Sequence, residues 1–152
     1  MRTIDIRIVE PDNKDLHDLI KMLDEHMLKL YPAEGIFGVD FSDPKVLQMT
    51  FCVAYINGTA AGCGALKPLG GGVAELKRFF VEPSFRGRGI ASLVLDFVED
   101  IARKAGITTM RLETGPKQPE AIGLYRKSGY REIEPYGEYV GCEYSYCMEK
   151  RL

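Results

Sequence analysis

The chain has 152 residues, 45% of them hydrophobic and 28% charged, which are ordinary values for one globular domain spanning residues 1–152. The formal net charge of −2 argues against a general nucleic-acid binder, because neutralising phosphates needs a basic excess. No apolar run reaches the ~20 residues of a membrane span, and residues 1–5 lack the apolar core of a signal peptide. We therefore expect a cytoplasmic protein with neither a nucleic-acid nor a membrane partner.

The first predicted elements are a strand and a helix. Ile4, Ile6 and Ile8 alternate with charged residues, which is the pattern of a half-buried strand. After Pro11, apolar residues recur close to the 3.6-residue repeat of an amphipathic helix. The apolar face of this helix consists of Leu16, Leu19, Ile20, Leu23, Met27 and Leu30.

A short helix and a hairpin are predicted next. Pro44 is tolerated in a first turn, so residues 43–48 are expected to form a short helix. Asn57-Gly58 separates apolar stretches at 50–56 and 60–67 and predicts a type I′ hairpin, because both residues tolerate positive φ. The glycine triplet at 70–72 precedes another strand rather than a helix, which favours a turn over a phosphate loop.

The second half of the chain alternates strands and helices. The resulting order, β-α-α-β-β-β-α-β-α-β-β, predicts one mixed α/β (α+β) domain. Cysteines lie in apolar stretches and have no C-x-x-C spacing, so we expect reduced core residues and no metal site. The predicted elements of this half are a strand at 74–81, a helix at 90–104, a strand at 107–113, a helix at 119–128 and strands at 130–133 and 144–149.

The segment 86–91, Arg-Gly-Arg-Gly-Ile-Ala, is the most informative in the chain. A strand ends before it, its glycines permit close backbone approach, and a helix begins at once. The first amides of a helix have no intrahelical partners and carry partial positive charge. Two arginines add to this charge, so the segment predicts an anion site of pyrophosphate size. Walker A and dinucleotide fingerprints fit worse, since Gly-Lys-Ser/Thr is absent and Ser92 replaces the third glycine.

This segment resembles the R/Q-x-x-G-x-G/A motif of the GNAT superfamily of N-acetyltransferases. A second run, 118–130, is similar to the superfamily pattern N-x-x-A-x-x-L-Y-x-x-x-G-F/Y, with Gln118 in place of the usual Asn. The resemblance covers nearly the whole chain. It implies a mixed central sheet of six to seven strands flanked by about four helices.

The resemblance also implies acetyl-CoA as the co-substrate. Backbone amides of the turn would bind its pyrophosphate, and main-chain groups at the end of the fourth strand would pair with its pantetheine arm. Gln118 would make a further contact. The remaining cofactor-binding residues implied are Phe79, Phe80, Val81, Arg86, Gly87, Arg88, Gly89, Ile90 and Ala91.

Two residues are assigned catalytic roles by resemblance. Tyr125 occupies the general-acid position, although it is also compatible with a core aromatic residue. Glu75 on the fourth strand is expected to act as general base through water, the alternative being a solvent-facing or ion-paired glutamate. Glu113 is the rival base, and it is also compatible with a ligand of the substrate amine or a structural partner of an arginine. Water alone is a third possibility for the base.

The acceptor is expected to be the primary amine of a small molecule, such as an amino acid or related metabolite. Alternatives are a protein lysine or N-terminus, or a non-catalytic sensor of acyl-CoA. Superfamily members are often dimers, so a homodimer is also expected. Candidate liners of the acceptor site, each also compatible with ordinary packing, are Tyr31, Phe37, Tyr136 and Tyr139.

Overall fold

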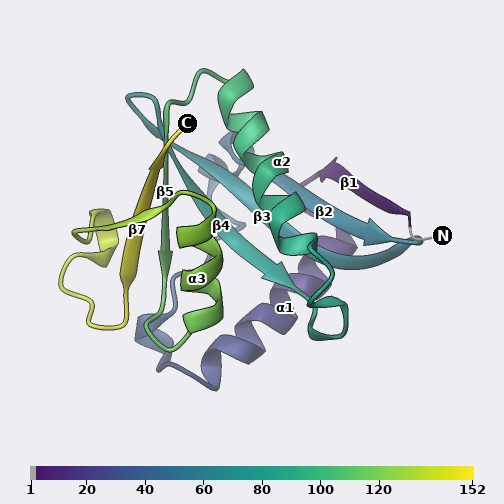
Figure 1. Ribbon diagram of the computed structural model, residues 1–152, viewed down its shortest axis with the longest axis horizontal. Coiled ribbons are helices and arrows are strands. Elements are labelled where there is room, and N and C mark those ends of the chain that lie inside the picture. Colours follow the sequence, from purple (N-terminus) through teal and green to yellow (C-terminus); the bar gives the residue numbers. More distant parts are fainter. Residues whose placement is uncertain (1–2) are drawn as a thin grey trace.

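The computed structural model describes residues 3–152 as a seven-stranded sheet with helices on both faces (Figure 1). The strands are ordered β1-β2-β3-β4-β5-β7-β6, and β4 and β5 are parallel whereas all other neighbours are antiparallel. The strands are β1 (Ile4–Val9), β2 (Thr50–Ile56), β3 (Thr59–Gly70), β4 (Val73–Val81), β5 (Thr109–Thr114), β6 (Arg131–Ile133) and β7 (Tyr146–Arg151). The α-helices are α1 (Lys14–Leu28), α2 (Ile90–Lys104) and α3 (Pro119–Lys127).

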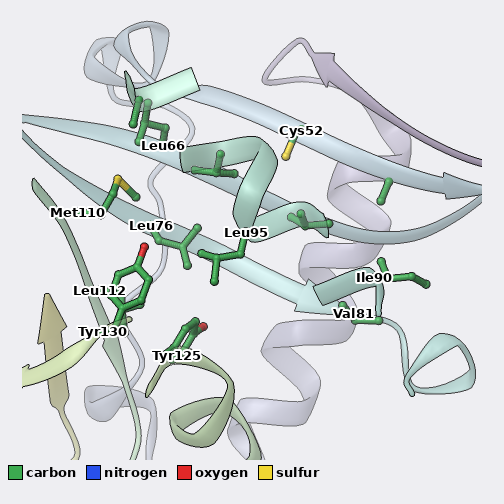
Figure 2. Close-up of a cluster of buried hydrophobic side chains, with 14 of the residues drawn as sticks. Cys52, Leu66, Leu76, Val81, Ile90, Leu95, Met110, Leu112, Tyr125 and Tyr130 are labelled. Carbon is green, nitrogen blue, oxygen red and sulfur yellow. The ribbon is translucent and has the colours of Figure 1, made fainter. Parts of the chain in front are cut away.

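Two hydrophobic clusters hold the helices to the sheet. On one face, Leu16 and Leu19 of α1 pack with Phe51 and Val53 of β2. On the other face, buried residues of α2 and Tyr125 of α3 pack against the sheet in the larger cluster (Figure 2). The 3.6-residue repeat predicted for α1 identifies the face that the sheet covers, since Leu16, Leu19, Ile20 and Leu23 are its buried residues. In α2 the apolar pattern also includes Leu93, which is exposed, whereas Leu95 is buried.

The predicted mixed α/β fold is confirmed, and so are its hairpins. Asn57 and Gly58 join β2 to β3 with φ angles of 48° and 85°, which are the positive values that a type I′ turn needs. The glycine triplet 70–72 joins β3 to β4, again with positive φ at each residue. No helix of the described residues is long and apolar enough to cross a membrane.

The helix count needs a correction. About four helices were expected, but residues 3–152 contain three α-helices, and the predicted helix at 43–48 is a five-residue 3₁₀ helix, Pro44–Gln48. The segment ends where β2 begins at Thr50, so it has no room for further turns. Three strands also begin one or two residues later than predicted, β5 at Thr109, β6 at Arg131 and β7 at Tyr146.

Strands β4 and β5 diverge along their length (Figure 1). Their parallel pairing runs from Val73 and Thr109 to Leu76 and Leu112, and it stops there. Beyond this point β4 continues to pair with β3 as far as Val81. Main-chain groups on the free side of residues 77–81 therefore face the gap, where an extended ligand can pair with them.

A β-bulge deforms β4 at the same place. Cys63 of β3 pairs with Phe80 and Ala65 pairs with Lys77, so two residues of β4 lie opposite Gly64 alone. Arg78 within the bulge has a φ of 51°, and the Cys63 thiol donates to the Arg78 carbonyl oxygen at 3.2 Å. The bulge changes which side chains of β4 share a face, with consequences for the site described next.

Candidate active site

A cleft of about 700 Å³ lies where β4 and β5 diverge. Its walls come from α1, the segment after α1, β4, the start of α2, the end of β5 and α3. Of the residues predicted as cofactor-binding, all except Arg88 line this cleft, and so do both predicted catalytic residues, Tyr125 and Glu75. The divergence of two strands thus brings together segments that are far apart in the sequence.

One end of the cleft is formed by the turn between β4 and α2. Gly87 and Gly89 have φ angles of 79° and 77°, and a Cβ built on either would have no atom within 4 Å. Gly89 is the N-cap of α2, with no side chain capping the helix and no acidic residue in its first turn. The amides that open α2 therefore face open space beside a positive helix end, and this suits an anion.

The two arginines of the turn differ in their contacts. The Nε of Arg86 donates to the carbonyl oxygen of Val81 at 3.0 Å, and its guanidinium lies over the Phe80 ring. Arg86 therefore fixes the turn to the end of β4. Arg88 is exposed, with its guanidinium 5.5 Å from the centroid of the Phe85 ring. Its charge adds to the positive potential near the turn without a fixed hydrogen bond among the described residues.

The main chain of Phe79 to Val81 lines the free side of β4, between the turn and the middle of the cleft. An arm that carries amide groups can pair with such an edge as an added strand does. The edge leads to the turn at 86–91, whose free amides and positive charge suit an anion. These residues therefore fit an acyl-CoA, with its pantetheine arm between β4 and β5.

Gln118 closes the loop between β5 and α3. Its Oε1 accepts from the amide of Gly115 at 3.2 Å and from the hydroxyls of Thr114 and Tyr31, each at 3.4 Å. Tyr31 lies outside the residues that line the cleft, and its hydroxyl accepts from the amide of Lys117 at 3.0 Å. A Cβ at Gly115 would lie 1.9 Å from the Tyr31 hydroxyl oxygen, so only glycine fits there. Tyr31 is thus a packing residue that supports Gln118.

Tyr125 is buried and faces the middle of the cleft. Burial is the main cause that raises the pKa of its phenol, and the nearby carboxylate of Glu113 adds to the effect. The phenol therefore stays protonated across the neutral range. Its ring packs between the rings of Phe79 and Tyr130, at centroid distances of 5.8 and 5.9 Å.

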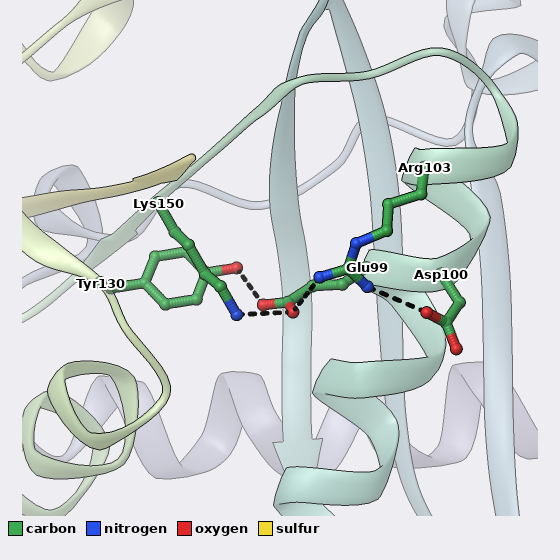
Figure 3. Close-up of polar contacts among 5 residues, drawn as sticks. All are labelled: Glu99, Asp100, Arg103, Tyr130 and Lys150. Carbon is green, nitrogen blue, oxygen red and sulfur yellow. Dashed lines mark hydrogen bonds and ion pairs between the residues drawn. The ribbon is translucent and has the colours of Figure 1, made fainter. Parts of the chain in front are cut away.

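The Tyr130 ring that packs against Tyr125 belongs to a buried ionic network around Glu99 (Figure 3). Tyr130 donates its hydroxyl hydrogen to Glu99 of α2 at 2.8 Å, and Lys150 of β7 donates to the same carboxylate at 2.8 Å. Glu99 is 2% exposed, so its charge depends on these partners and on Arg103 at 3.6 Å. The network ties α2 and β7 to the ring that packs against Tyr125.

The other end of the cleft is formed by buried charged side chains. Glu75 is 2% exposed, and its Oε2 accepts a hydrogen bond from the Tyr139 hydroxyl. The ammonium of Lys77 lies 3.7 Å from the same oxygen and donates to the Tyr139 hydroxyl at 3.0 Å. The solvent-facing alternative for Glu75 is therefore wrong, because the carboxylate is enclosed by Lys77 and Tyr139.

Glu113 lies beyond the last pair of β4 and β5 and lines the same end of the cleft. Burial raises the pKa of its carboxyl group to about 7, and the Glu75 carboxylate adds to this while Lys77 opposes it. A carboxyl group with this pKa exchanges its proton near neutral pH. Such a group is suited to acid–base chemistry.

The predicted acceptor-site aromatics separate into two groups. Phe37 and Tyr139 line the cleft and pack edge to face at a centroid distance of 4.8 Å. Tyr136 lies outside the cleft and lines a smaller hollow of about 390 Å³, to which Glu75 and Tyr139 also contribute. The Arg111 guanidinium lies 5.2 Å from the centroid of the Tyr136 ring.

Sequence reasoning missed several residues at this end. Lys77 and Arg78 line the cleft, although the sequence pattern gave them no role beyond pairing with Glu75. Residues from α1 to Leu30 also line the cleft, and no motif pointed to them. They are Leu23, His26, Met27 and Leu30. Among residues 3–152 there is no cluster of three or more His, Cys, Asp or Glu side chains placed to hold a metal ion.

Comparison with known families identifies the fold and its chemistry. The sequence model of the Acetyltransferase (GNAT) family matches residues 13–130. The chain belongs to the GNAT acetyltransferase family. It is therefore an acyltransferase that uses an acyl-CoA, and the resemblance noted in the sequence is confirmed.

Individual relatives agree with this assignment. An IAA acetyltransferase of Azospirillum brasilense is 39% identical over 135 residues, which cover 88% of each chain. A structure from Klebsiella pneumoniae, assigned as an acyl-CoA N-acyltransferase, is 30% identical with a TM-score of 0.87 and covers 99% of this GNAT chain and 98% of its own. The PaiA N-acetyltransferase of Thermoplasma acidophilum, solved with coenzyme A, is 21% identical with a TM-score of 0.74 and covers 99% of each chain.

Proposed function

We propose that this GNAT protein transfers the acetyl group of acetyl-CoA to the primary amine of a small molecule. The observation that carries the proposal is the pair of carboxyl groups, Glu75 and Glu113, at the buried end of the cleft. An amine arrives as an ammonium ion, so it is attracted by carboxylates and must lose a proton before it can attack. Phe37 and Tyr139 enclose this end, which favours a compact acceptor over a polypeptide.

In this proposal, the cofactor end of the cleft, residues 79–81 and 86–91, positions the acyl-CoA and takes no part in the proton transfers. The turn at 86–91 would hold the pyrophosphate with main-chain amides, and residues 79–81 would pair with the pantetheine arm. Acetyl-CoA, when bound, supplies a thioester whose acyl group is activated toward amines. Two fixed contacts at a distance from the reacting carbon orient it toward the carboxylates.

Of the two carboxyl groups, we assign proton acceptance to Glu113. Its pKa of about 7 leaves it deprotonated above neutral pH and able to take a proton from the ammonium. Glu75 already accepts from Tyr139 and lies against Lys77, so one of its oxygens is engaged. In this assignment Glu75 attracts the ammonium and orders Tyr139, instead of acting as the base.

Tyr125 would interact with the sulfur atom of coenzyme A as it leaves. A thiol has a pKa of about 8.5, and the pKa of this phenol is raised above its ordinary value of 10.0. Complete transfer of the phenolic proton to a thiolate is therefore uphill. We propose that the Tyr125 hydroxyl donates a hydrogen bond to the sulfur as negative charge develops on it.

The test is coenzyme A release from acetyl-CoA, measured with a panel of small primary amines and with a matched panel of lysine-containing and free-N-terminal peptides. The proposal predicts turnover with small amines at least about tenfold faster than with peptides. Faster turnover of peptides would establish the protein-acetylating alternative. Tight binding of acetyl-CoA by calorimetry, without turnover of either panel, would establish the sensor alternative.

A further inference from the structure

The bulge in β4 brings two cations, Lys77 and Arg78, to the face of the sheet on which Lys77 meets Glu75. In a regular strand successive side chains point to opposite faces of the sheet, so Lys77 and Arg78 would separate. Here both reach the α1 side: the Lys77 ammonium lies 3.5 Å from the Phe37 carbonyl oxygen, and the Arg78 guanidinium pairs with Asp24 of α1. Both residues line the cleft together with Glu75.

The contacts of Arg78 leave part of its guanidinium unused. Its side chain is 5% exposed, and one terminal nitrogen pairs with Asp24, a side chain that is 48% exposed. Its Nε is buried and has no hydrogen-bond partner within residues 3–152. A planar guanidinium offers five donors and binds carboxylates through two of them at once. A buried donor left without a partner is costly, so it indicates a group that the described residues do not supply.

The segment after α1 approaches Arg78 through a glycine. A Cβ built on Gly38 would lie 3.3 Å from a terminal nitrogen of Arg78, so a larger residue would crowd the guanidinium. At Gly38 the segment therefore comes close to the guanidinium with its main chain. Phe37 beside it contacts Tyr139 and the Lys77 ammonium, so the segment lies over both cations.

Charged side chains of both signs line this end of the cleft, and all but the half-buried Glu113 are buried. Glu75 and Glu113 supply the negative side, and Lys77 and Arg78 supply the positive side. Lys77 lies 3.7 Å from the Glu75 carboxylate and donates to the Tyr139 hydroxyl and the Phe37 carbonyl oxygen, whereas Arg78 keeps a buried Nε that has no partner among the described residues. A simple amine would engage only the carboxylates. An acceptor that carries an amine and a carboxylate together would engage both halves of the site.

We infer that the acceptor is an amino acid or a similar amine that bears a carboxylate, with Arg78 binding the carboxylate while the ammonium lies at Glu113 and Glu75. This inference rests on the proposed function and adds the second charged group of the substrate and the residue that selects it. Apolar side chains of α1, including Leu23 and Met27, line the same cleft and would contact the acceptor side chain. Arg78 is thus a specificity-determining residue outside the acyl-CoA site.

The inference is tested on the wild-type protein with matched acceptors. Each proteinogenic amino acid is compared with its own amide, which keeps the amine and the side chain but removes the negative charge. We expect kcat/KM for coenzyme A release to be about 10- to 100-fold higher for the acid, which corresponds to one hydrogen-bonded charge pair. The amine of an amide loses its proton more readily, so intrinsic reactivity favours the amide and a preference for the acid must come from the site.

Substitution of Arg78 tests whether its guanidinium causes the preference for the acid over its amide. In Arg78→Gln the kcat/KM of the acid divided by that of its amide is expected to fall to one or below, because a neutral side-chain amide retains little affinity for a carboxylate. Arg131→Gln is the matched control, since Arg131 is largely exposed and lies on β6, and its ratio should match that of the wild type. Retained acetyl-CoA affinity shows that the Arg78→Gln protein is folded.

The outcomes separate this inference from the function on which it rests. Equal turnover of acids and amides by the wild type would overturn the inference and leave the proposed amine acetyltransferase intact. A preference for acids that survives in a folded Arg78→Gln protein would overturn the role of Arg78. Absence of turnover with any small amine would overturn the proposed function itself. The wild-type comparison decides the first point even if Arg78→Gln does not fold.

Discussion

The two ends of the cleft are built in opposite ways. The cofactor end is one continuous segment, residues 86–91, and it offers main-chain amides in an exposed turn. The acceptor end consists of buried side chains from β4, β5 and the loop around Tyr139, which are distant in sequence. Main-chain amides persist through most substitutions, whereas each side chain is lost with a single mutation. The cofactor end should therefore tolerate side-chain truncation, and the acceptor end should not.

We expect the main-chain amides of residues 86–91 to lose acetyl-CoA binding only when a substitution blocks access to them. In Gly89→Glu, a carboxylate enters the position proposed for the pyrophosphate, at a residue whose φ of 77° disfavours any side chain. We expect the Kd for acetyl-CoA to rise about 1,000-fold, since two or more charge-assisted hydrogen bonds are lost. Calorimetry measures this change. Gly71→Glu is the matched control, because Gly71 also has positive φ and open surroundings but lies in the β3–β4 turn; equal losses in both variants would refute the assignment.

At the middle of the cleft, loss of the Tyr125 hydroxyl oxygen alone should lower kcat. Tyr125→Phe keeps the ring that packs against Phe79 and Tyr130 and removes only the hydroxyl. We expect kcat to fall about 300-fold, with acetyl-CoA affinity unchanged, because the hydroxyl acts only on the departing sulfur. Single-turnover kinetics provide the measurement, and Tyr146→Phe on β7 is the control. A fall below threefold would show that Tyr125 is only a core aromatic residue.

The pH dependence of kcat/KM should identify the general base at the acceptor end of the cleft. Because burial raises the pKa of Glu113 to about 7, the carboxylate that accepts the proton forms as pH rises through this value. Activity of the wild type is therefore lost as pH falls below about 7. In Glu113→Gln this acidic limb should vanish, and kcat/KM at pH 8 should fall about 100-fold. Glu132→Gln on β6 serves as the control, and an unchanged limb in Glu113→Gln would assign it to Glu75 or to the acceptor.

The smallest effect is expected for a side chain of the cofactor end. Arg88 is exposed and has no fixed partner beyond the Phe85 ring, so its charge contributes mainly through screened attraction. Arg88→Ala should raise the Kd for acetyl-CoA about threefold at low salt. The difference should disappear at high salt, as calorimetry at two ionic strengths would show. A loss comparable with that of Gly89→Glu would mean that side chains, rather than amides, hold the pyrophosphate.

The sequence by itself determined the family, the order of the strands and helices, and the glycine turn that we propose as the cofactor site. The Asn57-Gly58 hairpin, the apolar face of α2 and the glycine turn before it all depend on neighbours within a few residues, and periodicity reports such neighbours directly. The same locality explains the errors: at residues 43–48 the pattern indicated a helix, but the start of β2 limits it to a 3₁₀ helix.

Only the tertiary structure decided the acceptor end. The bulge opposite Gly64 turns Lys77 and Arg78 to one face, and no periodic pattern marks it because it depends on the register between β3 and β4. Glu113 lines the cleft because it lies beyond the last pair of β4 and β5, and the burial that raises its pKa depends on the segments packed around it there. Tyr31 and Tyr139 were equal candidates in the sequence, yet one supports a loop and the other donates to Glu75. Side-chain chemistry at a site built from distant segments follows from how those segments pack.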